Sequence, residues 1–285
     1  MASAQTSPEV FRLLDGQARP YVLIDRALPG VAANFVGVDD VKVGWIATEH
    51  LIDVGCRTVA YLGGVRLSSS LGRLEGYRQT LEQHGMSPGD DYVVGTEELN
   101  QAKEQIGYEA TKQLLCLCPR PDGIFCYADP AAMGAILAIA EAGFEIPQEV
   151  AVVGCGNCHY DEYLRVPLTS VDQQSEAIAR RASQVVVNLL ANPATSTSQT
   201  IRLTPKLVVR ASATGLGGAR KRLLKGARDG PSAHPTNPLQ PIDLKMYNPR
   251  VPGPENPVTS PQFRERLRSA DLREALRIVA LYEEQ

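Results

Sequence analysis

The sequence is poor in aromatic residues, cysteine and long apolar runs, and each shortage excludes a class of protein. Only 6% of its 285 residues are aromatic, whereas 44% are hydrophobic and 21% are charged. Six cysteines in a chain of this length are too few for a disulfide scaffold. No apolar run approaches the roughly 18 residues of a membrane span, so we expect no membrane partner. The composition fits a globular protein with one large or two smaller domains.

Positive charge is also scarce. The chain has 29 Lys and Arg residues against 32 Asp and Glu, which gives a formal net charge of -3. A protein without a broad cationic surface is poorly suited to hold nucleic acid by itself, so binding to DNA would need another domain. The first residues, "MASAQTSPEVFRLLDG", lack the basic segment and apolar core of an export signal, which predicts a cytoplasmic location.

Motifs for catalysis are missing as well. There is no Gly-rich phosphate loop, no Gly-x-Ser-x-Gly elbow and no His obviously paired with a nucleophile. Cys155, Cys158 and His159 do have the Cys-x-x-Cys-His spacing of covalent haem attachment. A zinc site is the second interpretation of these three residues, and an incidental spacing is the third, which we favour. We therefore expect no enzyme, no metal and no cofactor.

What the sequence does contain is a regular alternation of strand and helix patterns. The short β-branched runs "YVLID", "TVAYLGG", "GIFCYAD", "EVAVVGC" and "PLTSVDQ" predict strands. Longer stretches such as "KVGWIATEHLIDVG" and "PAAMGAILAIAEAG" predict the intervening helices, and Gly85 and Gly143 mark two helix ends. This alternation predicts an α/β fold with parallel sheets.

The character of the chain changes after residue 213. Residues 218–228 hold five basic residues and no acid, and residues 229–261 hold nine of the twenty prolines. We expect an extended or disordered linker over 214–260. An amphipathic helix is predicted over 261–285, with Ser260 as its N-cap. Self-association through this helix, and contact of the basic run with nucleic acid, are the less favoured alternatives.

Several segments together identify a family. In order they are "PYVLIDR", "GVDDVKVGWIATEHLIDVGCRTVAYLGG", "RLEGYRQTLEQHG", "PDGIFCYADPAAMGAILAIAEAGFEIPQEVAVVGCGN", "VPLTSVDQ" and "KLVVRAS". Over roughly residues 8–212 the chain resembles the effector-binding domain of the lactose repressor and galactose repressor (LacI/GalR) family. The resemblance implies a two-lobe, type I periplasmic-binding-protein-like architecture, with a small molecule held between the lobes.

The resemblance also implies a division of the chain. Residues 1–213 would form the sensor domain, with a partial N-lobe from 1–38 and 173–199. The C-lobe would comprise 39–172 and 200–213, and the chain would cross between lobes near Val38, near Val171 to Gln173 and near Thr200.

Two parts of a typical family member have no counterpart before Pro8. Family members begin with a helix-turn-helix of about 60 residues that reads DNA as a dimer. The first strands and helices of the N-lobe are also unmatched. We therefore expect a truncated lobe whose apolar residues, such as Val22, Ile24, Val186 and Leu190, are poorly covered.

In sugar-responsive members of the family, the turn after one strand usually reads Gly-Tyr-Asp-Asp or Gly-Phe-Asp-Asp, and the first Asp binds sugar hydroxyls. Here Gly156 takes the place of that Asp and Asn157 follows it. The family's Asn-Asp pair appears as Ala128 and Asp129, so a second polar contact is lost. We interpret Asp129, which precedes Pro130, as a helix cap rather than a ligand contact.

Two family contacts are retained. Arg73 matches the arginine that donates a forked pair of hydrogen bonds to effectors, a geometry suited to vicinal hydroxyls or a carboxylate. Asp25, at the end of "YVLID", matches an acidic residue of the site. The alternative is that both side chains are solvated or paired with each other.

The resemblance implies the sensor domain of a transcriptional regulator, in which a sugar or sugar acid closes the lobes and thereby alters DNA binding. The partners would be the effector, a second copy of the chain in a homodimer and operator DNA, the last through a domain not seen here. The alternative function is a substrate-binding protein of the periplasmic type without regulatory DNA binding.

Overall fold

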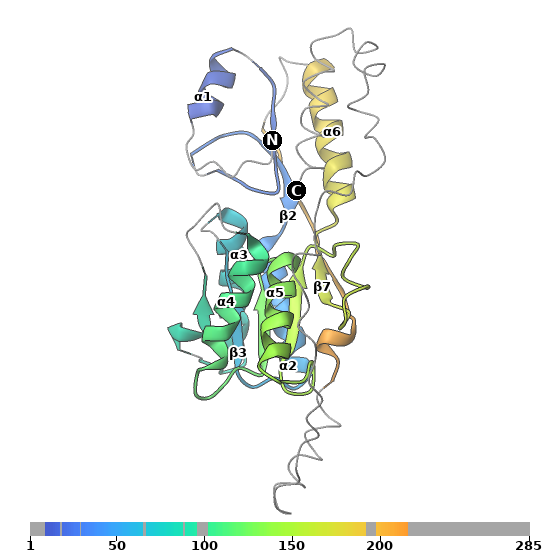
Figure 1. Ribbon diagram of the computed structural model, residues 1–285. Coiled ribbons are helices and arrows are strands. Elements are labelled where there is room, and N and C mark those ends of the chain that lie inside the picture. Colours follow the sequence, from blue (N-terminus) through green and yellow to red (C-terminus); the bar gives the residue numbers. More distant parts are fainter. Residues whose placement is uncertain are drawn as a thin grey trace, which may run out of the picture. The chain divides into compact units, whose positions relative to one another are not determined.

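The computed structural model describes residues 9–17, 19–28, 30–64, 67–87, 89–95, 102–191 and 198–215. Within these ranges the chain forms two β-sheets accompanied by helices, which confirms the α/β class (Figure 1). The predicted helix at 261–285, and all but the start of the predicted linker, lie outside the described residues. Among the described helices, none combines the length and apolar character of a membrane-spanning segment.

The first sheet has three parallel strands in the order β1 (Val22–Ile24), β2 (Asn34–Val38) and β8 (Thr200–Leu203). Two helices belong to this part of the chain, α1 (Glu9–Gly16) and α6 (Ser175–Ala191). Helix α6 packs against β1 and β2. The strand predicted from "YVLID" is therefore confirmed.

The apolar residues of this small sheet are better covered than the sequence suggested. Val22, Ile24 and Val186 are all buried, because α6 packs on the strands and Phe11 of α1 joins a cluster with the residues around β1. Of the four residues named in the expectation, Leu190, at 37% exposed, is the one that fits an open apolar face.

The pairing of β8 corrects one predicted boundary. We expected the chain to enter the second lobe near Thr200, but β8 pairs with β2 from Phe35 to Val38. Residues 200–203 thus belong to the small sheet, and the connection to the second sheet lies at residues 204–205, just before β9. The error arises because strand pairing depends on distant residues, which the local pattern does not contain.

The second sheet has six strands in the order β4-β3-β5-β6-β7-β9. They are β3 (Val59–Leu62), β4 (Val93–Val94), β5 (Gly123–Cys126), β6 (Ala151–Cys155), β7 (Thr169–Asp172) and β9 (Lys206–Val208). All neighbours are parallel except β7 and β9. The short strand β4 and the antiparallel edge strand β9 were not predicted.

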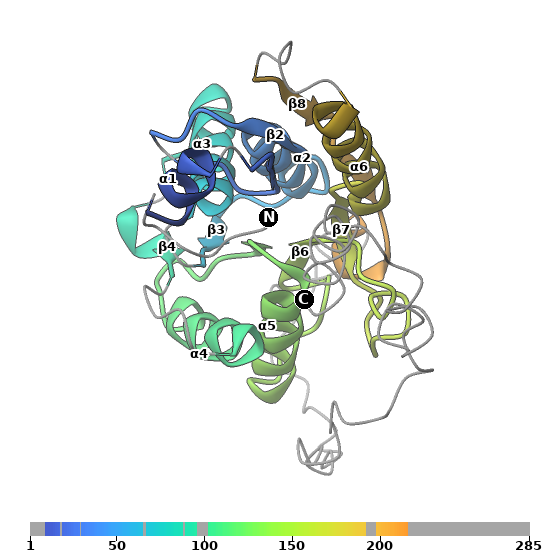
Figure 2. The same cartoon turned by 90° about the horizontal axis from the view of Figure 1, so that it is seen from above.

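Two helix pairs cover the second sheet (Figure 2). One pair is α2 (Asp40–Asp53) with α3 (Ser68–Gln83), and the other is α4 (Lys103–Leu115) with α5 (Asp129–Glu141). Along β3, Val59 and Tyr61 face the cluster that includes α2 and α3, whereas Ala60 and Leu62 face α4 and α5. This period of two is the signature of a strand buried on both faces.

The carboxyl ends of β5, β6 and β7 meet at one edge of the second sheet, because these strands are parallel neighbours. The segments that follow them contain Asp129, Asn157 and Gln173. Ligands of parallel sheets generally bind at this edge, so the topology brings candidate residues together that are far apart in sequence.

Glycines allow the two helices of each pair to approach closely. A Cβ atom added at Gly134 of α5 would lie 1.9 Å from the backbone oxygen of Glu104 of α4. The reciprocal contact involves Gly107, whose Cβ would lie 1.9 Å from the backbone oxygen of Ala131. The obstacle is backbone in both cases, so a side chain fits only if the helices separate.

We predict that Gly134→Ala destabilises the protein by at least about 2 kcal/mol, since overpacking outweighs the helix propensity gained from alanine. Urea denaturation measures the change. The control is Gly89→Ala, where no atom lies within 4 Å of the added Cβ, and we expect a change below about 0.5 kcal/mol. Equal stability of the two variants would contradict the close helix packing.

Candidate functional site

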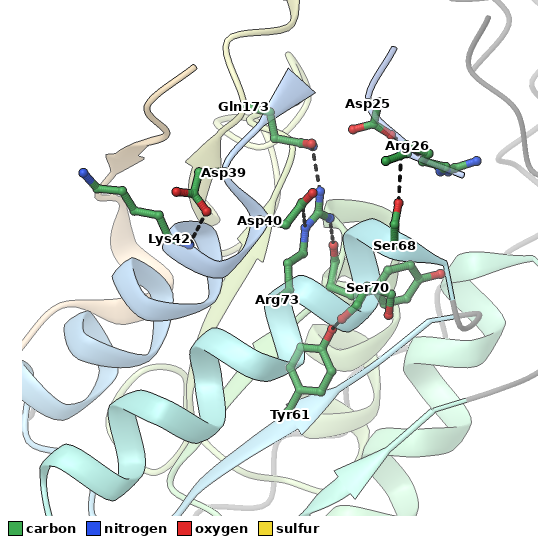
Figure 3. A network of polar contacts seen from close by, with 12 residues as sticks. Asp25, Arg26, Asp39, Asp40, Lys42, Tyr61, Ser68, Ser70, Arg73 and Gln173 are labelled. Carbon is green, nitrogen blue, oxygen red and sulfur yellow. Dashed lines mark hydrogen bonds and ion pairs between the residues drawn. The ribbon is translucent and has the colours of Figure 1, made fainter. Parts of the chain in front are cut away.

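Arg73 of α3 is a buried cation that binds three other segments of the chain (Figure 3). Its Nε donates to Asp40 Oδ1 at 3.0 Å, and its Nη2 donates to Gln173 Oε1 at 2.8 Å. Its Nη1 donates to the backbone oxygen of Tyr127 at 2.6 Å. The side chain is only 6% exposed, so these acceptors compensate for the water that the guanidinium loses on burial.

The acceptors of Arg73 come from the ends of structural elements. Asp40 is the first residue of α2, after β2 of the small sheet, and Gln173 follows β7 before the chain returns to that sheet. Tyr127 directly follows β5. The chain connects the two sheets at three places, and Arg73 binds a residue at two of them, Asp40 and Gln173. Through Tyr127 it also binds the carboxyl edge of the six-stranded sheet.

Three of the five N–H groups of Arg73 are used in this way. Among the described residues, no acceptor binds the second N–H of Nη1 or of Nη2. The predicted forked donor is therefore partly occupied by the protein itself. A ligand oxygen could accept from these two N–H groups, or it could displace one of the present acceptors and accept in its place.

The electrostatics of the pair favour a charged Arg73. Burial raises the pKa of Asp40 to about 6, opposed by the charge of Arg73 and assisted by that of Asp25. Burial also disfavours the cation of Arg73, but Cys155, Asp40 and Asp25 together shift the pKa of Arg73 upward. Arg73 is charged throughout the physiological range, and Asp40 is mostly ionised at neutral pH.

Asp25 lies close to this cluster without binding Arg73 directly. Its Oδ2 lies 3.5 Å from Nε of the neighbouring Arg26, so the alternative of an Asp25–Arg73 pair is wrong for this structure. The backbone of Asp25 has a positive φ of 64°, unusual for a residue with a side chain. The backbone nitrogen of Ala27 donates to Ser68 Oγ at 3.0 Å, and this hydrogen bond connects the segment to the start of α3.

Asp129 forms a second buried group, and its role differs from the predicted one. The N-cap of α5 is Ala128, without a side-chain hydrogen bond, so the interpretation of Asp129 as a cap is wrong. Instead Ser170 donates from Oγ to Asp129 Oδ1 at 2.6 Å, and the Cys158 backbone nitrogen donates to Oδ2 at 3.1 Å. Asp129 thus joins α5 to β7 and to the turn after β6.

The turn after β6 is shaped around this carboxylate. A Cβ atom at Gly156, where φ is +142°, would lie 2.6 Å from Asp129 Oδ2, so glycine is required here. The Asn157 backbone nitrogen donates to Ser170 Oγ at 2.9 Å, and Asn157 Oδ1 accepts from Arg210 Nη2 at 2.8 Å. An aspartate at position 156 would not fit this backbone.

The two groups flank the buried thiol of Cys155 at the end of β6. Burial raises the pKa of Cys155, while Arg73 lowers it and Asp129 raises it, so both groups lie within electrostatic range of one sulfur. Among the described residues, no hydrogen bond joins Arg73 to Asp129 or Asn157 directly. The sequence therefore predicted residues of both groups, but it did not predict which residues bind Arg73 and which bind Asp129.

Several residues of the site were missed from the sequence: Asp40, Tyr127, Ser170, Gln173 and Arg210. All follow or end a strand pattern except Ser170, which lies inside β7. Polar residues directly after predicted strands are the available signal, because parallel strands place them at a common edge.

The Cys-x-x-Cys-His pattern does not form a metal site in the described part of the chain. No group of three His, Cys, Asp or Glu residues there is placed to hold a metal ion. Cys155 is buried at the end of β6, whereas Cys158 is half-buried in the following turn. The Cys158 backbone nitrogen in this turn donates to Asp129.

Comparisons with known proteins agree with this architecture. Residues 48–213 match the family model of a periplasmic binding protein-like domain. The ribose operon repressor of Escherichia coli strain K12 is 31% identical over 196 residues, which cover 68% of this chain and 58% of the repressor. This chain thus spans less than two thirds of the length of that relative.

Solved structures of transcriptional regulators also have a similar fold. The transcriptional regulator CelR in complex with cellobiose matches with a TM-score of 0.68 and 27% identity, covering 74% of this chain and 64% of that one. A regulatory protein of the LacI family from Chloroflexus aggregans matches with a TM-score of 0.65 and 27% identity, covering 74% of each chain.

We predict that Asp40→Ala destabilises the protein by about 3 kcal/mol, because it leaves the buried guanidinium of Arg73 without its charged partner. The control is Asp39→Ala, which removes only the N-cap hydrogen bond to the Lys42 backbone nitrogen and should cost about 1 kcal/mol. Chemical denaturation at pH 7 measures both. Equal losses would show that the ion pair adds nothing beyond the local helix contact.

Proposed function

This chain belongs to the family of periplasmic binding protein-like domains, and from that premise we propose that it is the effector-sensing part of a LacI-family transcriptional regulator. The effector is a sugar or sugar acid, and its binding changes how the two sheets with their helices are arranged. The relatives reported above are regulators of transcription, so a substrate-binding protein without regulatory DNA binding is not favoured.

The observation that carries this proposal is the position of Arg73. Its guanidinium binds Asp40 and Gln173, which belong to two of the connections between the sheets. A ligand that accepts a hydrogen bond from Arg73 therefore changes the balance of bonds at these connections. Such a ligand can act as an effector because it binds the two arrangements of the connections unequally.

Gln173 is the acceptor that a ligand displaces most easily. It is uncharged and half-buried, whereas Asp40 is a carboxylate and Tyr127 accepts through its backbone. The bond to Asp40 also includes the attraction between opposite charges, which the bond to the neutral amide of Gln173 lacks. A ligand carboxylate or a pair of vicinal hydroxyls thus replaces Gln173 while the ion pair with Asp40 persists.

The ligand class follows from Arg73 and from the relatives. One relative is named for the ribose operon, and another was solved with cellobiose. Two polar contacts used by sugar-responsive members are missing here, since Ala128 offers a methyl group and Gly156 offers no side chain. We therefore propose a ligand that depends on the guanidinium more strongly than those relatives do.

The remaining partners are proposals of the same kind. The regulator would act as a homodimer in the cytoplasm, and its contact with operator DNA would come from a helix-turn-helix outside this chain. The net charge of -3 supports the proposal that a separate domain binds DNA, because this chain offers no cationic excess for the phosphate backbone. The chain itself binds a ligand and catalyses no reaction.

We predict that one of D-ribose, cellobiose and D-gluconate raises the melting temperature of the wild type, and that Arg73→Ala reduces affinity for that compound by at least about tenfold. Isothermal titration calorimetry measures the affinity. The control is Arg78→Ala on the same helix, whose side chain is 55% exposed and which should bind like the wild type. Equal binding by Arg73→Ala and the wild type would remove Arg73 from the site.

We predict that Gln173→Ala binds the same compound about fivefold more tightly, because the ligand no longer competes with a hydrogen bond worth about 1 kcal/mol. The same calorimetric titration measures the change. Weaker binding by this variant would show that Gln173 contacts the ligand or supports the site instead of competing with it.

A further inference from the structure

Asp161, at the end of the turn after β6, is a buried acid with no evident counter-charge. It is 0% exposed, and neither of its carboxyl oxygens accepts a hydrogen bond among the described residues. Its backbone is well held, since its nitrogen donates to the Cys158 oxygen and its oxygen accepts from the Leu168 nitrogen. A buried carboxylate without donors is strongly unfavourable, so this side chain needs an explanation.

A second acid that acts on Asp161 is Asp129, which is also 0% exposed. Both acids contact Cys158, whose backbone nitrogen donates to Asp129 Oδ2 and whose backbone oxygen accepts from the Asp161 nitrogen. Neither carboxyl group can donate to the other while both are ionised. Asp129 already accepts from Ser170 Oγ and from the Cys158 backbone nitrogen. Asp129 is therefore the better anion, and Asp161 is the better site for a proton.

We propose that Asp161 is a positioning residue of the turn at residues 156–161, and that it acts by sharing one proton with Asp129. The protonated carboxyl of Asp161 then donates to the carboxylate of Asp129. Asp129 becomes a threefold acceptor that holds β7, the Cys158 backbone and Asp161 at once. Any effect of this turn on effector binding rests on the function proposed above. The shared proton itself does not depend on that function.

The surroundings of Asp161 support this assignment. Asp129 faces it from α5, Arg210 from the segment after β9, and Cys158 and Tyr160 from its own turn. Arg210 does not form an ion pair with either acid, because its terminal nitrogens donate to Leu168 O and Asn157 Oδ1. The cation lowers the cost of negative charge here without replacing the proton.

The titration follows from the same contacts. Burial and the charge of Asp129 raise the pKa of Asp161 to about 8, against a smaller opposing effect of the Arg210 charge. In the unfolded chain an aspartate titrates near pH 4. The folded state therefore binds one more proton between about pH 4 and pH 8, and its stability falls across this window as pH rises.

The turn that depends on this proton carries Gly156 and Asn157. Asp129 fixes the turn through the Cys158 nitrogen, and Ser170, which donates to Asp129, also accepts from the Asn157 nitrogen. Loss of the proton places two negative charges against one another at the base of this network. The expected consequence is a looser turn above about pH 8.

The test is the melting temperature of Asp161→Asn relative to the wild type as a function of pH. Asparagine donates to Asp129 without taking up a proton, so the variant should equal the wild type near pH 4. It should then become more stable by roughly 5–10 °C at pH 8. Glu162→Gln, which removes the same charge from the exposed neighbouring residue, should show no such divergence.

A pH-independent difference between Asp161→Asn and the wild type would overturn the proposal, and so would a divergence equal to that of Glu162→Gln. If Asp161→Asn does not fold, infrared titration of the wild type decides. A protonated carboxyl band that persists at pH 7 and disappears above pH 8 supports the shared proton, and its absence at pH 7 refutes it. Neither measurement uses an effector, so failure of the proposed function leaves this test intact.

Discussion

A guanidinium that is taken out of water needs acceptors, and this requirement organises the candidate site. Arg73 obtains its acceptors from the start of α2, from the end of β5 and from the segment after β7. These segments are separated by 33, 54 and 100 residues from Arg73 in the sequence. One buried charge thereby holds together two connections between the sheets. A buried charge without partners costs several kcal/mol, so the loss of one hydrogen bond of Arg73 changes how strongly the guanidinium binds its remaining acceptors.

The topology explains why the second group lies nearby. Parallel strands end at a common edge, so the residues after β5 and β6 are neighbours although they are about 30 residues apart in sequence. Asp129 uses this proximity to bind the turn after β6 and the side chain of Ser170. Positions 128 and 156 carry the small residues Ala128 and Gly156. Gly156 in particular gives up a side chain so that the backbone can approach Asp129. Among the described residues, the turn after β6 binds Asp129, and two N–H groups of Arg73 have no acceptor.

Most of the strands and helices follow from the sequence because their signals are local. The short apolar run of β3 and the glycines after α3 and α5 can be recognised without knowledge of distant residues. The errors share the opposite property. Asp129 has the local context of a cap, but its partner Ser170 is 41 residues away. Residues 200–203 read as part of the second lobe, yet they pair with β2. The alternative partner of Arg73 in the sequence was Asp25, whereas its partner in the structure is Asp40 of α2, the helix that packs on α3.

The most direct test of this account is a crystal structure of the chain with the compound that binds it among sugars and sugar acids. The account predicts a ligand oxygen within hydrogen-bonding distance of Arg73 Nη1 or Nη2, with Asp40 still bound to Nε. A ligand that lies elsewhere and leaves all three hydrogen bonds of Arg73 unchanged would contradict it.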